Sequence, residues 1–419
     1  MTNSTQSKFS TKFDVSFPNF PSFNFAPRSV RLIQEKGKHD IVEISYNAFS
    51  DFYYKALKTG VPIQLTWSNE KSKGEFLGYV YSVTQTTQST LSRNVIIKGI
   101  GTGFPLKEST NRVWVNKSAP DIVADIAKKF KLVPVVTPSI VKFSQQSLTG
   151  HTYWEKVLEL AERIGYVAQI VGTELHFHPI DKMIDRFIAS VPILSFEEPE
   201  FNWGATYEGQ TLERFKPTVG DHVEWYGHPS RKIKSVSGID PVTGKLYTQK
   251  VSPKSVGNNV RQNVNEALFP EYHPTRMSVN KESAHEIAVS LAILARFSIP
   301  AEGSAQGDAR IAPYRTVDIN GTGSTTDAAW IITKANHFMT FDGRYTVEFQ
   351  CVTDGTGGSH PSASRPRNTS KVGIRNENFE LSTGTTSRPT SSKLSTPQPA
   401  IKKTESGFVV NPSKWVGVK

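Results

Sequence analysis

The sequence predicts a β-rich α+β protein in which two β-units of one kind are separated by a small α/β insert. Two hairpins carry this prediction, at residues 79–101 and 330–352, because both show the alternation of apolar and polar residues that is typical of half-buried strands. Each follows a short alternating strand, at 61–67 and 314–319 respectively. Between the hairpins, apolar residues recur at helical spacing, which indicates the insert.

The composition is that of a folded chain of several domains. Its 419 residues are 37% hydrophobic and 11% aromatic, which is enough for about two to four domains that each bury a core. The sequence contains no apolar run of the length, about 18 residues, that a membrane span needs. The polar N-terminus lacks a secretion signal, so we expect neither a span nor export by that route.

The positive charge is concentrated at one end of the chain. The net charge is +11, but residues 356–419 contain ten Lys or Arg against three Asp or Glu. The preceding residues are therefore nearly balanced at +4. A nucleic-acid-binding protein would carry clustered Lys and Arg on its folded part, so the charge distribution argues against that class.

The first β-unit is predicted at residues 29–111, after an extended arm at 1–28. Prolines exclude a helix in the arm, and its phenylalanines need an apolar surface, for which a neighbouring subunit is the expected source. In the hairpin of the first unit, a polar link is expected at residues 85–94. The phenylalanines of the arm are Phe9, Phe13, Phe17, Phe20, Phe23 and Phe25.

The α/β insert is predicted at residues 112–189. Ser118 is expected to cap one helix, and Thr152 with Glu155 forms a capping box at the start of a second. Gly165 is the expected end of the second helix, because glycine readily adopts the left-handed conformation that terminates helices.

The second β-unit is predicted at residues 190–355, with a helical insertion at about 280–297 that Asn280 caps. A strand is expected at 219–226, and the Asp342-Gly343 pair is the expected turn of the second hairpin.

Residues 356–419 are predicted to form a flexible, basic tail or linker, because they are rich in Ser, Thr, Pro and Gly. The tail ends in large apolar residues, which we expect to anchor a partner protein. The alternative is a linker with no binding role. The expected anchoring residues are Phe408, Val409, Val410 and Trp415.

No set of residues predicts a catalytic, cofactor or metal site. His176 and His178 share one side of a strand, but they lack a third ligand at a useful spacing and are expected to face solvent. Cys351 is the only cysteine and lies on the apolar side of its strand, so a buried structural thiol is expected. The acidic cluster around Pro199 is expected to be solvated rather than catalytic, and comprises Glu197, Glu198 and Glu200.

Five short segments together resemble the phage late-control-D type of tail baseplate hub, a family that includes the VgrG-like spike proteins of contractile injection machines. The resemblance covers residues 28–355, and it rests on the order and spacing of the segments. They are 60–65 (GVPIQL), 78–80 with 97–101 (GYV and IKGIG), 118–123 (SAPDIV), 152–165 (TYWEKVLELAERIG) and 341–347 (FDGRYTV).

The resemblance implies two tube-protein-like β-barrels on either side of the insert, and a homotrimeric ring in which six barrels match the hexameric tail tube. Such a structural hub of a virion tail baseplate would join the tube or its adaptor to a threefold central spike, with DNA only passing through the lumen. It would be made in the cytoplasm of the host bacterium. The chain departs from longer members of the family in lacking a spike repeat and a lysozyme-like domain, which implies a separate spike protein.

Two other classes stay open. A receptor- or carbohydrate-binding tail protein would also be β-rich and aromatic, and a peptidoglycan hydrolase would be an enzyme of the same machine. The sequence does not distinguish contractile from non-contractile tails.

Overall fold

The structure is a computed structural model, and the residues it describes all belong to one compact unit, Met1–Gly384. The strand expected at 219–226 and the tail expected at 356–419 lie outside the described residues. The described residues are 11–23, 25–47, 51–89, 92–187, 192–196, 211–218, 233–240, 242–251, 271–272, 280–297, 299–323 and 326–353.

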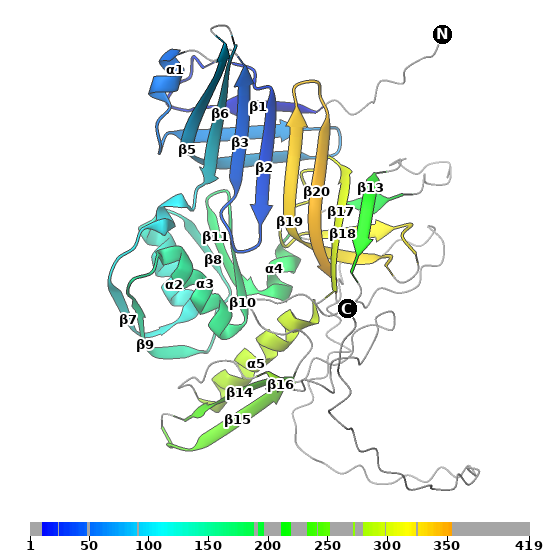
Figure 1. Ribbon diagram of the computed structural model, residues 1–419. Helices are drawn as coiled ribbons and strands as arrows, with labels where there is room; N and C mark the ends of the chain where they lie inside the picture. The colour runs from blue at the N-terminus through cyan, green and yellow to red at the C-terminus, as the bar shows by residue number, and fades with distance from the viewer. Residues whose placement is uncertain are drawn as a thin grey trace, which may run out of the picture. The chain divides into compact units, whose positions relative to one another are not determined.

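A 12-stranded sheet is the largest element of the fold, and its strands come from both ends of the described chain (Figure 1). The strands are β1 (Lys12–Ser16), β2 (Ser29–Glu35), β3 (Ile41–Asn47), β4 (Pro62–Ser68), β5 (Lys73–Ser89), β6 (Ser92–Gly101), β12 (Ile193–Ser195), β13 (Leu212–Pro217), β17 (Ile299–Gln306), β18 (Thr316–Asn320), β19 (Ala328–Thr340) and β20 (Tyr345–Thr353). The main path runs in the order β1-β4-β5-β6-β3-β2-β19-β20-β17-β13, while β18 pairs with β19 and β12.

The two halves of the sheet have the same strand order. The first half contains β4-β5-β6-β3-β2, and the second contains β18-β19-β20-β17-β13, with antiparallel pairing at every step. The longest strand of each half shifts register at the same place, after Val80 in β5 and after Ile332 in β19. The predicted hairpins at 79–101 and 330–352 therefore occupy equivalent positions in a structural repeat.

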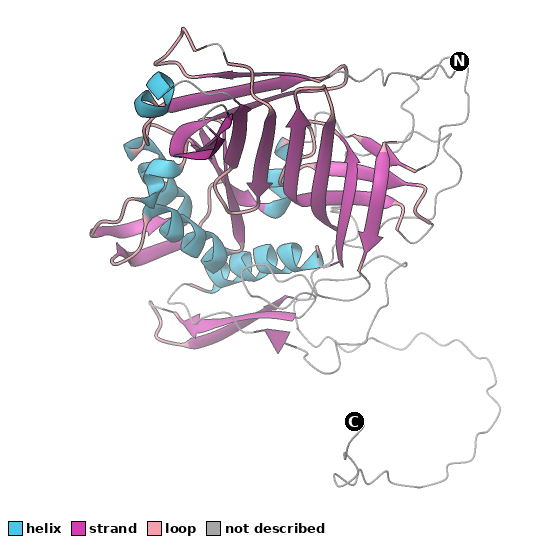
Figure 2. Ribbon diagram, turned by 45° about the horizontal axis from the view of Figure 1, so that its top comes forward, coloured by secondary structure: helices cyan, strands magenta, loops and turns pink. Residues whose placement is uncertain are grey.

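Both halves nevertheless lie in one continuous, curled sheet (Figures 1 and 2). The join is the antiparallel pairing of Ser29–Glu35 in β2 with residues 334–340 of β19. The prediction of two separate barrels is therefore not confirmed, because alternation predicts where strands lie but not which strand covers an edge. The polar link expected at 85–94 is also wrong: β5 and β6 continue through most of it.

The N-terminal arm packs on its own chain. β1 pairs with β4, and Phe17 and Phe23 are buried in the core of the large sheet, where Tyr46 also lies. The ring centroids of Phe17 and Phe23 are 4.8 Å apart, with the edge of one ring toward the face of the other. For the described part of the arm, the expectation of packing on a neighbouring subunit is wrong.

The two helices predicted within residues 112–189 begin where their capping residues predict. Ser118 and Thr152 begin two helices with complete capping boxes, and Gly165, with φ of 72°, ends the second. One small sheet has the strand order β10-β11-β8, with β11 in the middle, and another pairs β7 with β9. The elements of this region are β7 (Arg112–Ser118), α2 (Ala119–Lys129), β8 (Val133–Val136), β9 (Lys142–Leu148), α3 (Tyr153–Ile164), β10 (Tyr166–Val171), β11 (Glu174–Pro179) and α4 (Ile180–Arg186). Before it come α1 (Asp51–Ala56), between β3 and β4, and the 3-10 helix Phe104–Lys107, after β6.

The helix expected at 280–297 is α5 (Lys281–Arg296), and Asn280 caps it as predicted. Its buried residues Ala284, Ile287 and Leu291 share one core with α2 and α3, so this helix packs on the insert. It also contacts the strands β14 (Ile233–Ile239) and β15 (Leu246–Val251), and the short β16 (Glu271–Tyr272) pairs with β14. Among the described residues, no helix has the length and apolar character of a membrane span.

Candidate assembly surface

One face of the large sheet is mostly polar from β5 across to β13, although exposed Ile41, Ile96 and Phe338 also lie on it. Cross-strand partners lie on the same face of a sheet, and the register places Arg31 opposite Glu43, which in turn lies opposite Lys98. The alternate residues Val30 and Leu32 are fully buried beneath them. The sheet therefore has one apolar side that forms the core and one side that meets solvent.

Opposite charges are paired on this polar face. Lys98 Nζ lies 2.7 Å from Glu43 Oε1, and Lys334 Nζ lies 3.5 Å from Glu35 Oε2. Burial alone would raise the pKa of Glu35, but Lys38 and Lys334 outweigh it and hold that pKa below its usual value. Exposed pairs contribute about 0–1 kcal/mol each to stability, so their main effect here is to leave the face without a strong excess of either charge.

A buried hydrogen-bond network crosses between the two halves of the sheet. Trp67 Nε1 of β4 donates to the hydroxyl of Tyr345 at 3.0 Å, and the same hydroxyl lies 2.9 Å from Nδ1 of His337. Burial lowers the pKa of His337 to about 4, so the ring is neutral at pH 7, and burial raises the pKa of Tyr345. These groups fix the halves to each other, since a buried polar group left without its partner costs about 1–3 kcal/mol.

A second contact between the halves joins two turns. Asn69 Nδ2 donates to the carbonyl of Gly307 at 2.7 Å, and the amide of Ala309 donates to Ser72 Oγ at 2.9 Å. A Cβ on residue 307 would lie 1.9 Å from the ring of Tyr345, so only glycine fits there. The halves are thus joined by backbone pairing, by a buried network and by these turns.

The turn between β2 and β3 fixes the insert to the sheet. Trp154 Nε1 of α3 donates to the carbonyl of Gly37 at 3.0 Å, and the amide of Gly37 donates to Gln169 Oε1 at 3.2 Å. In the same turn, Gln34 Nε2 donates to Asp40 Oδ2 at 2.8 Å, while burial raises the pKa of Asp40 to about 7. A single carboxyl held by an amide is a structural arrangement.

The expectation that His176 and His178 face solvent is wrong. Their exposed fractions are 2% and 3%, and burial lowers the pKa of both to about 4. His178 Nδ1 lies 2.8 Å from Thr137 Oγ1. The physical reason is α4, which the sequence reasoning did not predict and which follows β11 directly and packs back onto it. In the part of the chain that the structure describes, no three His, Cys, Asp or Glu residues could hold a metal ion.

Of the other residues considered as candidate sites in the sequence, only Cys351 lies among the described residues. Cys351 is buried at 1% exposure, and burial raises the pKa of its thiol well above the usual value, as expected for a structural residue. The acidic cluster and the predicted anchors lie outside the described residues, namely Glu197, Glu198, Glu200, Phe408, Val409, Val410 and Trp415.

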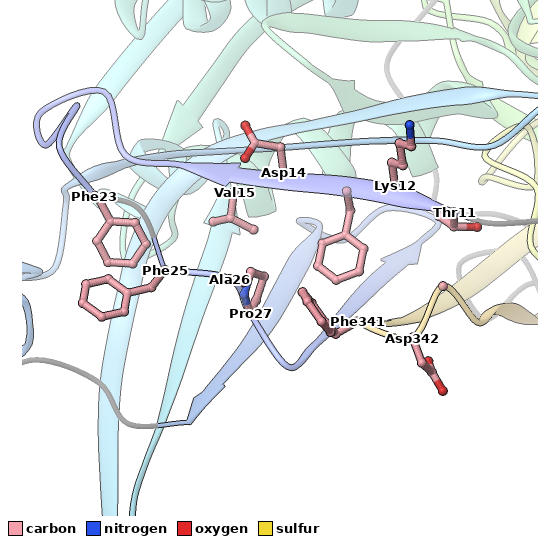
Figure 3. Close-up of a pocket in the computed structure, with 12 residues that line it drawn as sticks. Thr11, Lys12, Asp14, Val15, Phe23, Phe25, Ala26, Pro27, Phe341 and Asp342 are labelled. Carbon is pink, nitrogen blue, oxygen red and sulfur yellow. The ribbon is translucent and has the colours of Figure 1, made fainter.

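A cavity of about 450 Å³ opens beside the N-terminal strand (Figure 3). Its lining comes from β1, the segment before β2 and the turn between β19 and β20, and includes Phe23, Phe25 and the exposed Phe341. The amide of Thr11 donates to the carbonyl of Gly343 at 3.3 Å across it. Its lining thus combines these aromatic rings with the charged residues Lys12, Asp14 and Asp342.

Comparison with known proteins identifies the fold. No family model and no curated protein matches the chain. Among solved structures, a tail protein from Neisseria meningitidis MC58 matches with a TM-score of 0.57 and 13% sequence identity, over 84% of this chain and 100% of that one. The 43 kDa tail protein of prophage MuSo2 from Shewanella oneidensis matches with a TM-score of 0.53 and 11% identity, over 83% and 99% of the two chains.

A third match comes from the E. coli type VI secretion system. Its c3393 protein, described as structurally similar to T4 bacteriophage tail proteins, gives a TM-score of 0.51 and 9% identity, over 84% of this chain and 80% of that one. The chain therefore has the fold of phage tail proteins. The resemblance to tail baseplate hubs and VgrG-like proteins that its short segments indicated is confirmed at the level of fold.

Sequence reasoning missed the network of Trp67, His337 and Tyr345. Part of the signal was present, because His337 shares its strand parity with Ala335 and Met339, which are apolar and buried. The identity of the partner was not readable, since Trp67 and Tyr345 are 278 residues apart in sequence.

Proposed function

We propose that the protein is the structural baseplate hub of a bacteriophage tail, and that three copies form a ring between the hexameric tail tube and a threefold central spike. The observation that carries this proposal is the repeat within the chain, in which two halves have one strand order. Three chains of two equivalent halves present six similar units to the tube and three identical chains to the spike.

The polar face of the sheet fits the lining of such a ring. Its charges are paired across strands, as in Lys98 with Glu43, and a DNA-binding surface would instead gather unpaired Lys and Arg. DNA would then pass through the lumen without being held. The proposed partners are the tube protein or its adaptor, the spike and neighbouring baseplate proteins, and the proposed location is the virion tail.

The ring is tested by the mass of the purified protein in solution. Light scattering should give three times the chain mass of 46.5 kDa, and negative-stain images should show rings with threefold symmetry. A monomeric mass at concentrations well above those needed for assembly would contradict the proposal. Specific binding of the monomer to individual glycans on an array would favour the receptor-binding alternative.

We also propose that the protein has no catalytic activity. Burial is the main cause of the raised pKa of Asp40, which the amide of Gln34 holds. Burial is also the main cause for Asp181 and Glu162, whose acidic neighbours Asp185 and Glu159 lie one turn away on the same helix. Purified protein should leave a peptidoglycan gel intact. Clearing of the gel that is lost in a Glu197→Gln or Glu198→Gln variant would overturn this proposal.

A further inference from the structure

One strand pairing joins the two halves of the chain, and the repeat contains a second pair of strands equivalent to it. β2 is the last strand of the first half, and it pairs with residues 334–340 of β19 in the second half. The equivalent of β2 in the second half is β13, because each is the fifth and last strand of the shared order. Aligning the two register shifts makes residues 82–88 of β5 the equivalent of residues 334–340.

Both equivalent edges end the sheet among the described residues. β5 pairs with β4 only over residues 73–79, and from Ser82 onward its described strand partner is β6 alone. β13 pairs with β17 on one side, and no described strand lies on its other side. In Figure 1 these edges lie at opposite ends of the row of strands that runs from β5 to β13.

We infer that β13 of one copy of this chain pairs antiparallel with residues 82–88 of β5 in a second copy, and so repeats between chains the contact that β2 makes with β19 within one chain. The inference rests on the proposed ring and names the contact that closes it. Such a head-to-tail contact uses two different surfaces of each chain, and it closes into a ring when its rotation divides a full turn.

The internal contact also fixes the register of the external one. Arg31 lies opposite Phe338 in the β2–β19 pairing, and their equivalents are Lys216 in β13 and Thr86 in β5. Both equivalents are exposed. Lys216 Nζ lies 3.7 Å from Glu302 Oε1 on the inner neighbour β17, so its side chain already has a charge partner in the monomer.

One difference separates the two contacts. Pro217 occupies the position of Leu32, and proline has no N–H to donate to a neighbouring strand. The contact between chains would therefore have one hydrogen bond fewer than the contact within the chain. Polar residues and proline at exposed strand edges also discourage pairing with wrong partners. Such an edge would remain unpaired until it meets a second copy of the chain.

Cysteine cross-linking of the full chain tests this contact. In the Thr86→Cys/Lys216→Cys variant, oxidation should shift most of the protein from one chain to covalent trimers, and a reductant should reverse the shift. The matched control is Glu75→Cys/Lys216→Cys, because Glu75 is an exposed residue of the same strand that lies where β4 covers the edge. The native Cys351 is buried and should not react.

Light scattering of the unmodified protein separates this inference from the ring itself. Trimers that cross-link in the Thr86→Cys/Lys216→Cys variant and not in the control support both. A trimeric mass without cross-linking, or with equal cross-linking in the control, overturns the strand contact and leaves the ring standing. A monomeric mass without cross-linking overturns both.

Discussion

The two halves of the sheet repeat one hydrogen-bond pattern with different residues. In the first half Val42 lies opposite Gly99, and in the second the equivalent pair is Ala301 opposite Cys351. A Cβ on Gly99 would lie 2.7 Å from a methyl carbon of Val42. The first half therefore pairs valine with a glycine, which has no side chain, and the second half pairs alanine with cysteine. The total side-chain volume of the two pairs is similar.

The turn before the longest strand shows the same contrast. The amide of Gly60 donates to the carbonyl of Val80 at 2.8 Å, and the amide of Tyr314 donates to that of Ile332 at 2.8 Å. Both residues have positive φ, 90° and 63° respectively. Glycine adopts this conformation freely and tyrosine does not, but Tyr314 is buried beside Ile331 in a core that the first half lacks.

The connections explain why the second half differs. A turn of a few residues joins β2 to β3, whereas the chain between β13 and β17 contains β14, β15 and α5. Phe297, at the end of α5, lies in the same buried cluster as Tyr314. The second half has thus adapted its turn to support an insertion, and the first half keeps the simpler form.

Tyr314→Gly should have the largest effect, because it gives the second half the residue of the first. The loss of a buried aromatic costs about 3–5 kcal/mol, and relief of the positive φ returns about 1 kcal/mol. Denaturant unfolding should show a clear net loss. Gly60→Ala is the matched variant and should cost only about 1 kcal/mol, because a Cβ at that position meets no neighbour. Equal losses would show that the burial of Tyr314 does not stabilise the turn of the second half.

Gly99→Cys should cost about 1–3 kcal/mol through its clash with Val42. Adding Val42→Ala transfers the pair found in the second half, and it should recover about 1 kcal/mol relative to the sum of the single variants. A double-mutant cycle in denaturant measures this coupling. Strict additivity would mean that the pairs do not share one volume.

The pH dependence of stability should be smaller after His337→Gln, since Gln85 stands at the equivalent position of the first half. The folded pKa of His337 is about 4, below its usual 6.5. The unfolded state therefore takes up a proton first as pH falls, and stability declines between pH 6.5 and 4 by up to about 1.4 kcal/mol per pH unit. His151→Gln, at an exposed site, should leave the slope unchanged. An unchanged slope in His337→Gln would contradict the assignment.

Removal of residues 404–419 should have the smallest effect on the folded part, because the described strands of both halves end at Thr353. The mass of the assembled ring should stay the same, while copurification of a neighbouring tail protein should weaken. Deletion of residues 385–400 is a control that shortens the tail and keeps its apolar end. Normal incorporation with every partner retained would show that the tail is only a linker.

Local features of this chain could be predicted where the cause is local. The capping boxes at Ser118 and Thr152 and the helix end at Gly165 depend on residues within one turn of each other. The turn at Gly343 likewise depends on neighbours, and its φ of 87° is as expected. Alternation also placed Cys351 in the core.

Features that depend on distant pairing could not be predicted in this way. The burial of His176 follows from α4, whose contact with β11 is a matter of packing. The continuity of the sheet follows from the pairing of β2 with β19. The residues of β2 do not identify β19 as the strand with which β2 pairs. The candidate surface was found only in part, because its cross-strand ion pairs require the register.

The pairing of β2 with β19 also constrains the order in which the chain folds. Ser29 meets Thr340, so during synthesis the first half leaves the ribosome with its outer strand uncovered until nearly all of the described chain has followed. Contacts of such wide sequence separation form slowly, because the chain loses the entropy of the long loop before the contact contributes favourable free energy. The first half therefore has an exposed strand edge at β2 for most of the synthesis of the chain, and exposed edges of this kind favour aggregation.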